Sequence, residues 1–211
     1  VDAAIAANST LGLMEPTGCG IGGDLFALVW SPADRKLFGL NASGPAPKGL
    51  TFRDMLTELN KIGLSNVPSY GPFSVTVPGA VAGWYKLHER FGKLSMDTLL
   101  QPAIEYAESG FAVTQVVARD MAFNLRKYKE EIHLIPEFEN FQKTFLHNGR
   151  MPLEGEVFRN QDLAQTLRTI AAGGRDAFYR GAIAQTIDTY ARKVGLRLRI
   201  SDLNSFEAEW V

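Results

Sequence analysis

Residues 15–30 read EPTGCGIGGDLFALVW and contain the stretch that decides how the chain folds. Within it, Gly18, Gly20 and Gly23 satisfy the letters of the G-x-G-x-x-G pattern that marks many nucleotide-binding loops. In such loops a strand precedes the glycines and a helix follows them, because the free N–H groups at the start of that helix hold the phosphate. The order of the neighbouring elements therefore tests whether this loop can bind phosphate.

The elements around the glycines are predicted in the opposite order. Residues 2–13 are rich in Ala, Ile and Leu, which predicts a largely buried helix closed by the Glu15-Pro16 break. Residues 25–30 form a short apolar run that predicts a buried strand. The helix end that faces the loop carries carbonyl groups and a partial negative charge, which repels phosphate.

We therefore interpret the glycines as a tight turn whose backbone packs closely against another element. The glycines of this turn are Gly18, Gly20, Gly22 and Gly23.

After the turn, the sequence predicts one hairpin and then a series of helices. Residues 37–40 are the expected partner of the first strand across a turn at residues 31–34. Helices are predicted at residues 52–61, between Pro78-Gly79 and Gly92, at 99–107 and at 182–193. Two further helices are predicted from their N-caps, one from Thr114 to about residue 127 and one from Asn160 to Gly173-Gly174. A last N-cap and short turn is predicted at Ser201. Residues 129–158 have weak periodicity and are predicted to form loops with short turns. The fold class is therefore α+β and helix-rich, with two strands that cannot form a stable sheet unaided.

Composition excludes several classes of function. The 211 residues are 45% hydrophobic and 21% charged, which is ordinary for one or two globular domains. Twenty-two basic against 23 acidic residues leave a net charge of -1, so we expect no nucleic-acid partner. No run approaches the roughly 20 apolar residues of a membrane span. The expected partners are a small molecule or another protein chain.

Self-contained catalytic or metal chemistry is not visible in the sequence. Cys19 is the only cysteine, and it is either a nucleophile or, more commonly for a lone cysteine, a small buried thiol. His88, His133 and His147 are far apart and form no H-x-x-x-H pair, so we expect no metal site. His88 is predicted on a helix face at the rim of the core. No serine lies in a G-x-S-x-G context, and no cofactor is expected.

Several segments in order resemble the N-terminal part of the gamma-glutamyltransferase family, whose members are also called glutathione hydrolases. They are DAAIAANSTLGLMEPTGCGIGGDLFALVW, GLNASGPAPKGLT, GPFSVTVPGAVAGWYKLHERFG, LLQPAIEYAESGFAV, GGRDAFYRGAIAQTIDTY and ISDLNSFEAEW. The resemblance covers nearly the whole chain, and the order and spacing of the segments make it specific. Asp24 and Leu25 stand where further glycines are usual in some members.

The resemblance implies an N-terminal nucleophile hydrolase with a partial four-layer α-β-β-α fold. Such enzymes are precursors that cut themselves into two subunits, and the new N-terminal Thr of the small subunit attacks a substrate amide. Residues 1–211 would be an incomplete large-subunit portion of a single domain, because the chain opens at Val1 rather than Met and ends within an apolar and acidic run. No catalytic residue is then expected here, since the nucleophile, Thr or Ser, would lie beyond Val211. The remainder of the precursor is the expected protein partner, and apolar surface left open would favour a homodimer.

One departure from the family concerns the substrate. Typical members carry an Arg-Glu pair before Ala-Pro, and the Arg is taken to bind the substrate α-carboxylate; here Ser43 and Gly44 occupy these positions. Loss of that guanidinium removes a charge-assisted contact of about 1.5 to 3 kcal/mol. Lys48 or Arg53 nearby could replace it.

Asn41 and Ser43 are the predicted substrate-binding residues, the alternative being a plain strand-to-loop turn with local hydrogen bonds. The substrate is predicted to be a gamma-glutamyl compound or, as in divergent members, a small amide such as oxamate. A non-catalytic binding or structural relative is the third alternative. The sequence leaves the location of the protein open between cytoplasmic and exported.

Overall fold

The computed structural model describes residues 1–135 and 137–211. Its sheet is built on the hairpin that follows the glycine turn, with β1 (Leu25–Ser31) antiparallel to β2 (Lys36–Ala42). The Ser31 hydroxyl donates to the carboxylate of Asp34 across 2.8 Å, which closes the predicted turn between the strands. A strand that the sequence did not reveal, β5 (Glu209–Trp210), pairs with β2 and gives the order β1-β2-β5.

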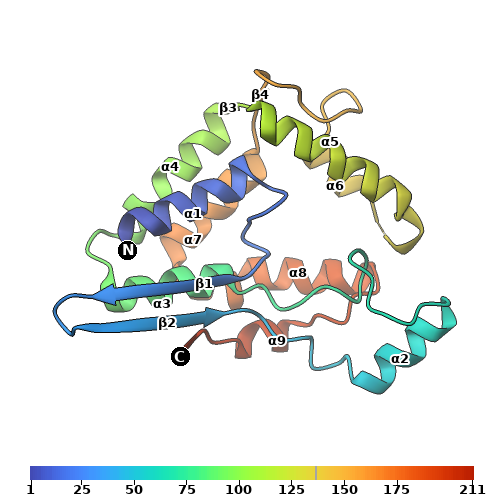
Figure 1. The fold of residues 1–211 in the computed structure, drawn as a ribbon, viewed down its shortest axis with the longest axis horizontal. Helices are drawn as coiled ribbons and strands as arrows, with labels where there is room; N and C mark the ends of the chain where they lie inside the picture. The colour runs from blue at the N-terminus through green and yellow to red at the C-terminus, as the bar shows by residue number, and fades with distance from the viewer. Residues whose placement is uncertain (136) are drawn as a thin grey trace.

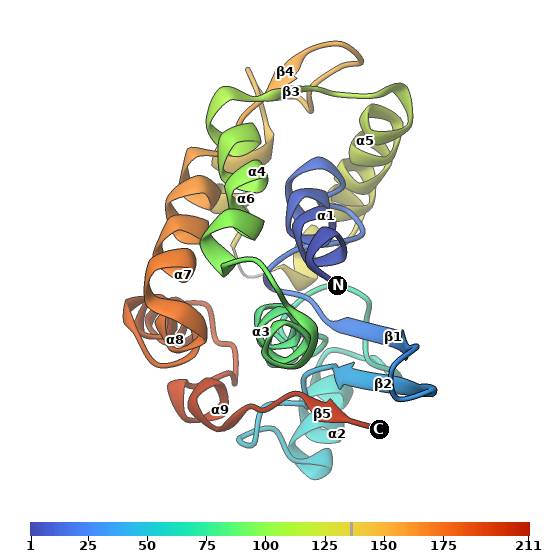
Figure 2. The same cartoon turned by 90° about the vertical axis from the view of Figure 1, so that its left-hand side faces the viewer.

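Helices cover one face of this sheet. The helix α3 (Ala80–Phe91) packs against β1 and β2, and Gly83 gives it room beside Leu25 and Ala42. Beyond α3 lie α1 (Asp2–Met14), α4 (Met96–Ser109), α7 (Gln161–Tyr179), α8 (Ala182–Lys193) and α9 (Ile200–Ser205) (Figures 1 and 2). Their apolar faces form one core, whose largest members include Ile5, Trp84, Leu100, Ile104, Leu167 and Tyr179.

The other face of the hairpin is apolar and exposed. Alternation along β1 places Phe26, Leu28 and Trp30 on this face, with exposed fractions of 69%, 77% and 58%. Leu37, opposite Trp30 in the register, is 54% exposed. Figure 2 shows this side of the hairpin turned away from the helices. Both faces of β1 are therefore apolar, which explains the continuous apolar run in its sequence.

A second group of short elements packs at the C-terminal end of α1. It comprises β3 (Phe111–Ala112), α5 (Gln115–Glu130), a 3-10 helix (Ile132–Leu134), α6 (Glu139–Phe145) and β4 (Val157–Phe158). Strands β3 and β4 form a separate two-stranded sheet. The helix α2 (Phe52–Lys61) lies at the opposite side of the molecule (Figure 1) and begins with a capping box of Thr51 and Asp54.

Most predicted helices are confirmed, and two details are wrong. Within residues 129–158, α6 and β4 form where loops with short turns were predicted, because the stacked rings of Phe138 on Phe141 and of Phe145 on Phe158 hold them; Pro136 lies outside the described residues. The last helix begins at Ile200 rather than after Ser201, because the Asp202 carboxylate accepts the Arg199 backbone N–H. The predicted helix end at Gly173-Gly174 is confirmed: Gly174 adopts a non-helical φ of 71° there, and a second helical segment, counted with α7, continues to Tyr179.

The α+β, helix-rich fold class is confirmed. None of the helices described is both long and apolar enough to cross a membrane.

Candidate functional site

The glycine turn connects the C-terminus of α1 to β1, as the order of elements predicted. Gly18 and Cys19 donate their backbone N–H groups to the carbonyl of Glu15, and Gly23 donates to the carbonyl of Gly20. A Cβ atom on Gly20 would meet nothing within 4 Å. The closest approach to the turn instead involves Gly12 of α1, where a Cβ would lie 3.2 Å from the Gly20 Cα.

The carbonyl of Gly23 caps the N-terminus of α3. It accepts the backbone N–H groups of Gly79 and Ala80, each at 2.9 Å. Two residues further on, the N–H of Ala82 is satisfied by the buried Tyr179 hydroxyl at 3.1 Å, and this hydroxyl donates to the Pro78 carbonyl at 2.7 Å. Burial raises the pKa of Tyr179, so the hydroxyl keeps its proton. Three N–H groups at the start of α3, those of Gly79, Ala80 and Ala82, are thus already occupied within the fold.

The end of β2 is pressed against the segment that leads into α3. A Cβ atom on Gly44 would lie 1.6 Å from the carbonyl oxygen of Val77, and one on Gly79 would lie 1.9 Å from that of Ala42. Only glycine fits at these two positions, because a backbone atom stands where the side chain would begin. The glycine turn, the end of β2 and the start of α3 therefore form one closely packed junction.

Polar groups at this junction include both predicted substrate-binding residues. The backbone N–H of Ser43 donates to the side-chain oxygen of Asn41 at 2.9 Å, which is the local bond expected of a plain turn. The Ser43 hydroxyl also donates to the Asp24 carboxylate at 3.2 Å, and the Gly44 N–H donates to the same carboxylate at 3.1 Å. Asp24 thus joins the glycine turn to the end of β2.

Asn41 and Ser43 line a cavity of about 440 Å³. The cavity is also lined by Asp202 and Ser205 of α9 and by Glu207 and Glu209 after it, and Glu209 pairs with Asn41 in the sheet. Of the two cations that the sequence offered as replacements for the family Arg, Lys48 lines this cavity, and Arg53 of α2 does not.

The charged groups of Lys48, Asp202 and Glu207 in this cavity have hydrogen-bond or ion-pair partners. The Lys48 ammonium donates to the Ser205 hydroxyl at 2.8 Å. Asp202, which is only 4% exposed, accepts the backbone N–H groups of Lys48 and Arg199. Glu207 pairs with Arg175 at 3.0 Å. The cavity wall therefore carries three carboxylates and one ammonium group, and the latter already has a hydrogen-bond partner.

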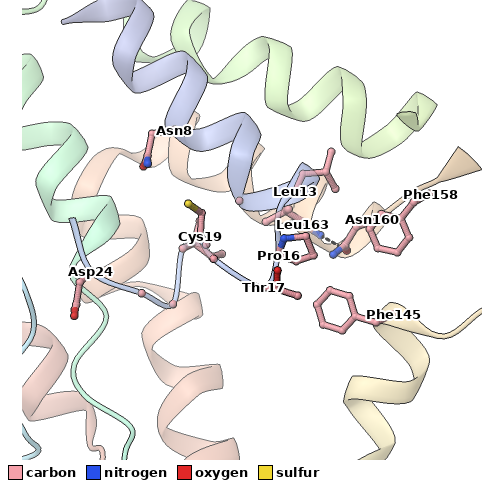
Figure 3. A pocket seen from close by; sticks show the side chains of 16 residues that line it. Asn8, Leu13, Pro16, Thr17, Cys19, Asp24, Phe145, Phe158, Asn160 and Leu163 are labelled. Atoms are coloured by element: carbon pink, nitrogen blue, oxygen red, sulfur yellow. Dashed lines mark hydrogen bonds between the residues drawn. The ribbon is translucent and has the colours of Figure 1, made fainter. Parts of the chain in front are cut away.

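A second cavity, of about 490 Å³, lies on the other side of the glycine turn. In Figure 3 the rings of Phe145 and Phe158 stand on the Thr17 side of this cavity, whereas Asp24 is at its far end. Cys19 lines it and is partly exposed, so the expectation of a buried thiol is wrong: the turn carries this side chain towards the cavity rather than into the core.

The histidines do not come together. His88 is half-buried on α3, as predicted for the rim of the core, with a ring nitrogen 2.6 Å from the Leu94 carbonyl oxygen. His133 and His147 are exposed on other elements. Over residues 1–135 and 137–211, no group of three His, Cys, Asp or Glu residues is arranged to hold a metal ion.

Comparison with known proteins places this geometry in a family. The family model described as gamma-glutamyltranspeptidase matches residues 1–211. The chain belongs to the gamma-glutamyltranspeptidase family. The predicted resemblance is thereby confirmed.

Three relatives illustrate the range of this family. The chain is 32% identical over 209 residues to the glutathione hydrolase-like YwrD proenzyme of Bacillus subtilis, covering 99% of the chain and 38% of that protein. It is 31% identical over 214 residues to the oxamate amidohydrolase proenzyme of Klebsiella pneumoniae, again covering 99% of the chain and 38% of the relative. The crystal structure of cephalosporin acylase from Bacillus halodurans matches with a TM-score of 0.89 and 40% identity over 100% of the chain and 38% of that structure.

The chain thus spans about two fifths of the length of these gamma-glutamyltranspeptidase relatives. The structural match confirms the predicted fold class. Of the four-layer architecture, the described residues contain one three-stranded sheet and the helices on one of its faces.

Sequence reasoning missed the contacts of Asp24. In the sequence, Asp24 is a departure from the glycine-rich pattern, and a charged side chain next to a glycine run is the signal that could have indicated its role. Its partner Ser43 lies 19 residues away, so only the folded hairpin shows that the two side chains meet.

Proposed function

We propose that these residues belong to an amide hydrolase of the gamma-glutamyltranspeptidase family that works through an acyl-enzyme. The observation that carries the proposal is the family match over residues 1–211, supported by the polar cavity at the end of β2. The relatives are named for different amide compounds, which supports amide hydrolysis as the shared reaction. The shape and charge of the cavity would then decide which acyl group this protein accepts.

In the proposed reaction the nucleophile is an N-terminal Thr, or Ser, that lies beyond Val211. Its hydroxyl oxygen attacks the amide carbonyl carbon, and its own α-amino group takes the hydroxyl proton. That proton passes to the leaving nitrogen as the C–N bond breaks, and water or an amine then takes the acyl group from the ester. Asn41 and Ser43 contribute a wall of the acyl site, and the junction of β2 with α3 holds this wall rigid.

The exposed face of the hairpin fits the same proposal. Phe26, Leu28 and Trp30 form an apolar surface on β1, which a second sheet supplied by the rest of the precursor would cover. The remainder of the precursor is thus the proposed protein partner of residues 1–211.

A small amide without the α-amino acid head group of a gamma-glutamyl compound is favoured over a gamma-glutamyl substrate. Ser43 stands where typical members carry the carboxylate-binding Arg, and the Asp24 carboxylate is only 3.2 Å from its hydroxyl oxygen. A substrate carboxylate placed there would meet a like charge instead of a guanidinium. Lys48 is the cavity cation that could still bind such a carboxylate, although it would have to share its donors with Ser205.

The proposal is tested by producing a precursor that continues beyond Val211. We expect self-cleavage into two chains on a denaturing gel, with N-terminal sequencing of the smaller chain identifying Thr or Ser. The cleaved enzyme is then assayed with L-gamma-glutamyl-p-nitroanilide and with oxamate, and residues 1–211 alone serve as the control without a nucleophile. A precursor that stays intact and releases no product from either compound would instead support a non-catalytic relative. Turnover by residues 1–211 equal to that of the precursor would overturn the assignment of the nucleophile.

A further inference from the structure

The Asp24 side chain lies directly behind Ser43, at the boundary between the two cavities. It lines the cavity beside the glycine turn, whereas Ser43 and Gly44 line the cavity at the end of β2. The two carboxylate oxygens accept from different groups, the Ser43 hydroxyl at 3.2 Å and the Gly44 N–H at 3.1 Å. The Gly44 backbone packs against the Val77 carbonyl, where an added Cβ would lie 1.6 Å from the oxygen, and the two bonds together hold the exposed Asp24 carboxylate beside Ser43.

This arrangement sets the hydrogen-bonding polarity of Ser43. A carboxylate has acceptor atoms only, so the Ser43 hydroxyl is the donor in this bond and uses its single proton there. The backbone N–H of Ser43 is likewise committed, to the side-chain oxygen of Asn41. What remains for a molecule in the cavity is the pair of hydroxyl lone pairs. An Arg at this position would present donors only, so the polarity of this position is inverted.

The carboxylates that line the cavity also disfavour a substrate carboxylate beside Ser43. Three carboxylates, those of Glu207, Glu209 and the buried Asp202, line the same cavity, against the one ammonium of Lys48, which donates to Ser205. A carboxylate beside Ser43 would therefore face lone pairs and like charges, while a carboxamide N–H or an amine would find an acceptor.

We propose that Asp24 is a positioning residue that selects the acyl group: through Ser43 it favours acyl chains ending in a hydrogen-bond donor, such as a carboxamide, and rejects chains ending in a carboxylate. The inference rests on the proposed function, since it concerns the acyl site of that amide hydrolase. It adds the chemical class that the site accepts and the residue that sets it.

The experiment uses the full precursor and two p-nitroanilides of equal length. One is glutaryl-p-nitroanilide, which ends in a carboxylate, and the other is its terminal carboxamide. We expect the native enzyme to have a kcat/KM at least about tenfold higher for the carboxamide, because one like charge and one lost hydrogen bond act together. Asp24→Asn should reduce this ratio to about 3 or less by allowing the Ser43 hydroxyl to turn, mainly through a lower KM for the carboxylate.

The chain offers a matched control in Asp34→Asn. Asp34 also accepts from a serine hydroxyl, that of Ser31 at 2.8 Å, but it lies at the other end of the hairpin. This variant should keep the native ratio. Ser43→Ala removes the acceptor while leaving the bond between Asp24 and Gly44, so it should lower kcat/KM for the carboxamide and serves if Asp24→Asn does not fold.

Two results would overturn the inference: a native enzyme without preference for the carboxamide, or an unchanged ratio in Asp24→Asn, which includes the equal loss for both substrates that a purely structural role would give. If the precursor hydrolyses no amide, the proposed function fails and calorimetry decides the inference separately. Tighter binding of glutaramate than of glutarate, with the difference lost in Asp24→Asn, would support it. Equal binding, or none, would refute it.

Discussion

Replacing Tyr179 with Phe removes one hydroxyl from the buried N-terminus of α3 and leaves the ring in place. That hydroxyl donates to the Pro78 carbonyl at 2.7 Å and accepts the Ala82 N–H at 3.1 Å. Gly79, the N-cap of α3, has no side chain that could take over. Pro78 and Ala82 are both buried, and Tyr179 itself is 0% exposed, so the two backbone groups would lose their partner away from solvent.

The magnitude follows from the two groups left unsatisfied. Each costs about 1 to 3 kcal/mol when buried without a partner, so Tyr179→Phe should lower the free energy of unfolding by about 2 to 6 kcal/mol. For a chain of this size, the midpoint temperature should fall by about 4 to 24 °C. Urea unfolding of residues 1–211, followed by circular dichroism, measures the change.

Tyr106→Phe is the matched control, because this tyrosine is 46% exposed on α4 and its loss of a hydroxyl should cost less than about 0.5 kcal/mol. Hydrogen exchange gives a second measurement, since the Ala82 amide should lose protection in Tyr179→Phe. If Tyr179→Phe unfolds within about 0.5 kcal/mol of the native chain and the Ala82 amide stays protected, the hydroxyl does not cap α3 and the reasoning is wrong.

Three further predictions concern separate parts of the chain. Gly44→Ala should destabilise the chain by about 1 to 3 kcal/mol or more in urea unfolding, because its Cβ would start 1.6 Å from a backbone oxygen; a native-like midpoint would contradict the packed junction. The guanidinium of Arg150, which binds both oxygens of Glu156, lowers the pKa of that carboxyl to about 2. The stability that this ion pair contributes should be present above about pH 4.5 and should be lost as the pH falls through 2. NMR titration of the Glu156 carboxyl measures its pKa, and a pKa that stays at 2 in Arg150→Gln would show that Arg150 does not lower it. Leu40→Ala should lower the free energy of unfolding by about 2 to 5 kcal/mol, since Leu40 is 2% exposed. Leu28→Ala should lower it by less than about 0.5 kcal/mol, since Leu28 is 77% exposed. Equal losses would show that the two faces of the hairpin are not buried differently.

Elements whose signals lie close together in the chain could be predicted from the sequence. Thr114 and Asn160 each accept the N–H of the third residue that follows, at 3.4 and 2.9 Å, as their predicted roles as N-caps required. Gly92 ends α3 where the sequence placed its stop. Such signals are readable because the groups that satisfy a helix end are within a few residues of it.

Elements that depend on distant partners could not be predicted in this way. Phe141 and Phe145 belong to α6, which is too short to show a helical repeat and is held by stacking on Tyr128 and Phe158. The strand β5 is only two residues long and exists because β2 offers it an open edge. In both cases the stabilising contact comes from a part of the chain that local periodicity does not include.

The same division applies to the site. The sequence by itself determined the order of helix, glycine turn and strand, and with it the exclusion of phosphate, because the direction of a helix follows from chain order alone. It also determined the family, through the order and spacing of its segments, which the comparison confirms. Only the tertiary structure decided that Asp24 stands behind Ser43 and that Tyr179 caps a helix 97 residues away. A hydrogen bond needs its two atoms within about 3 Å, and for residues so far apart in the chain that distance is set by the packing of the whole fold.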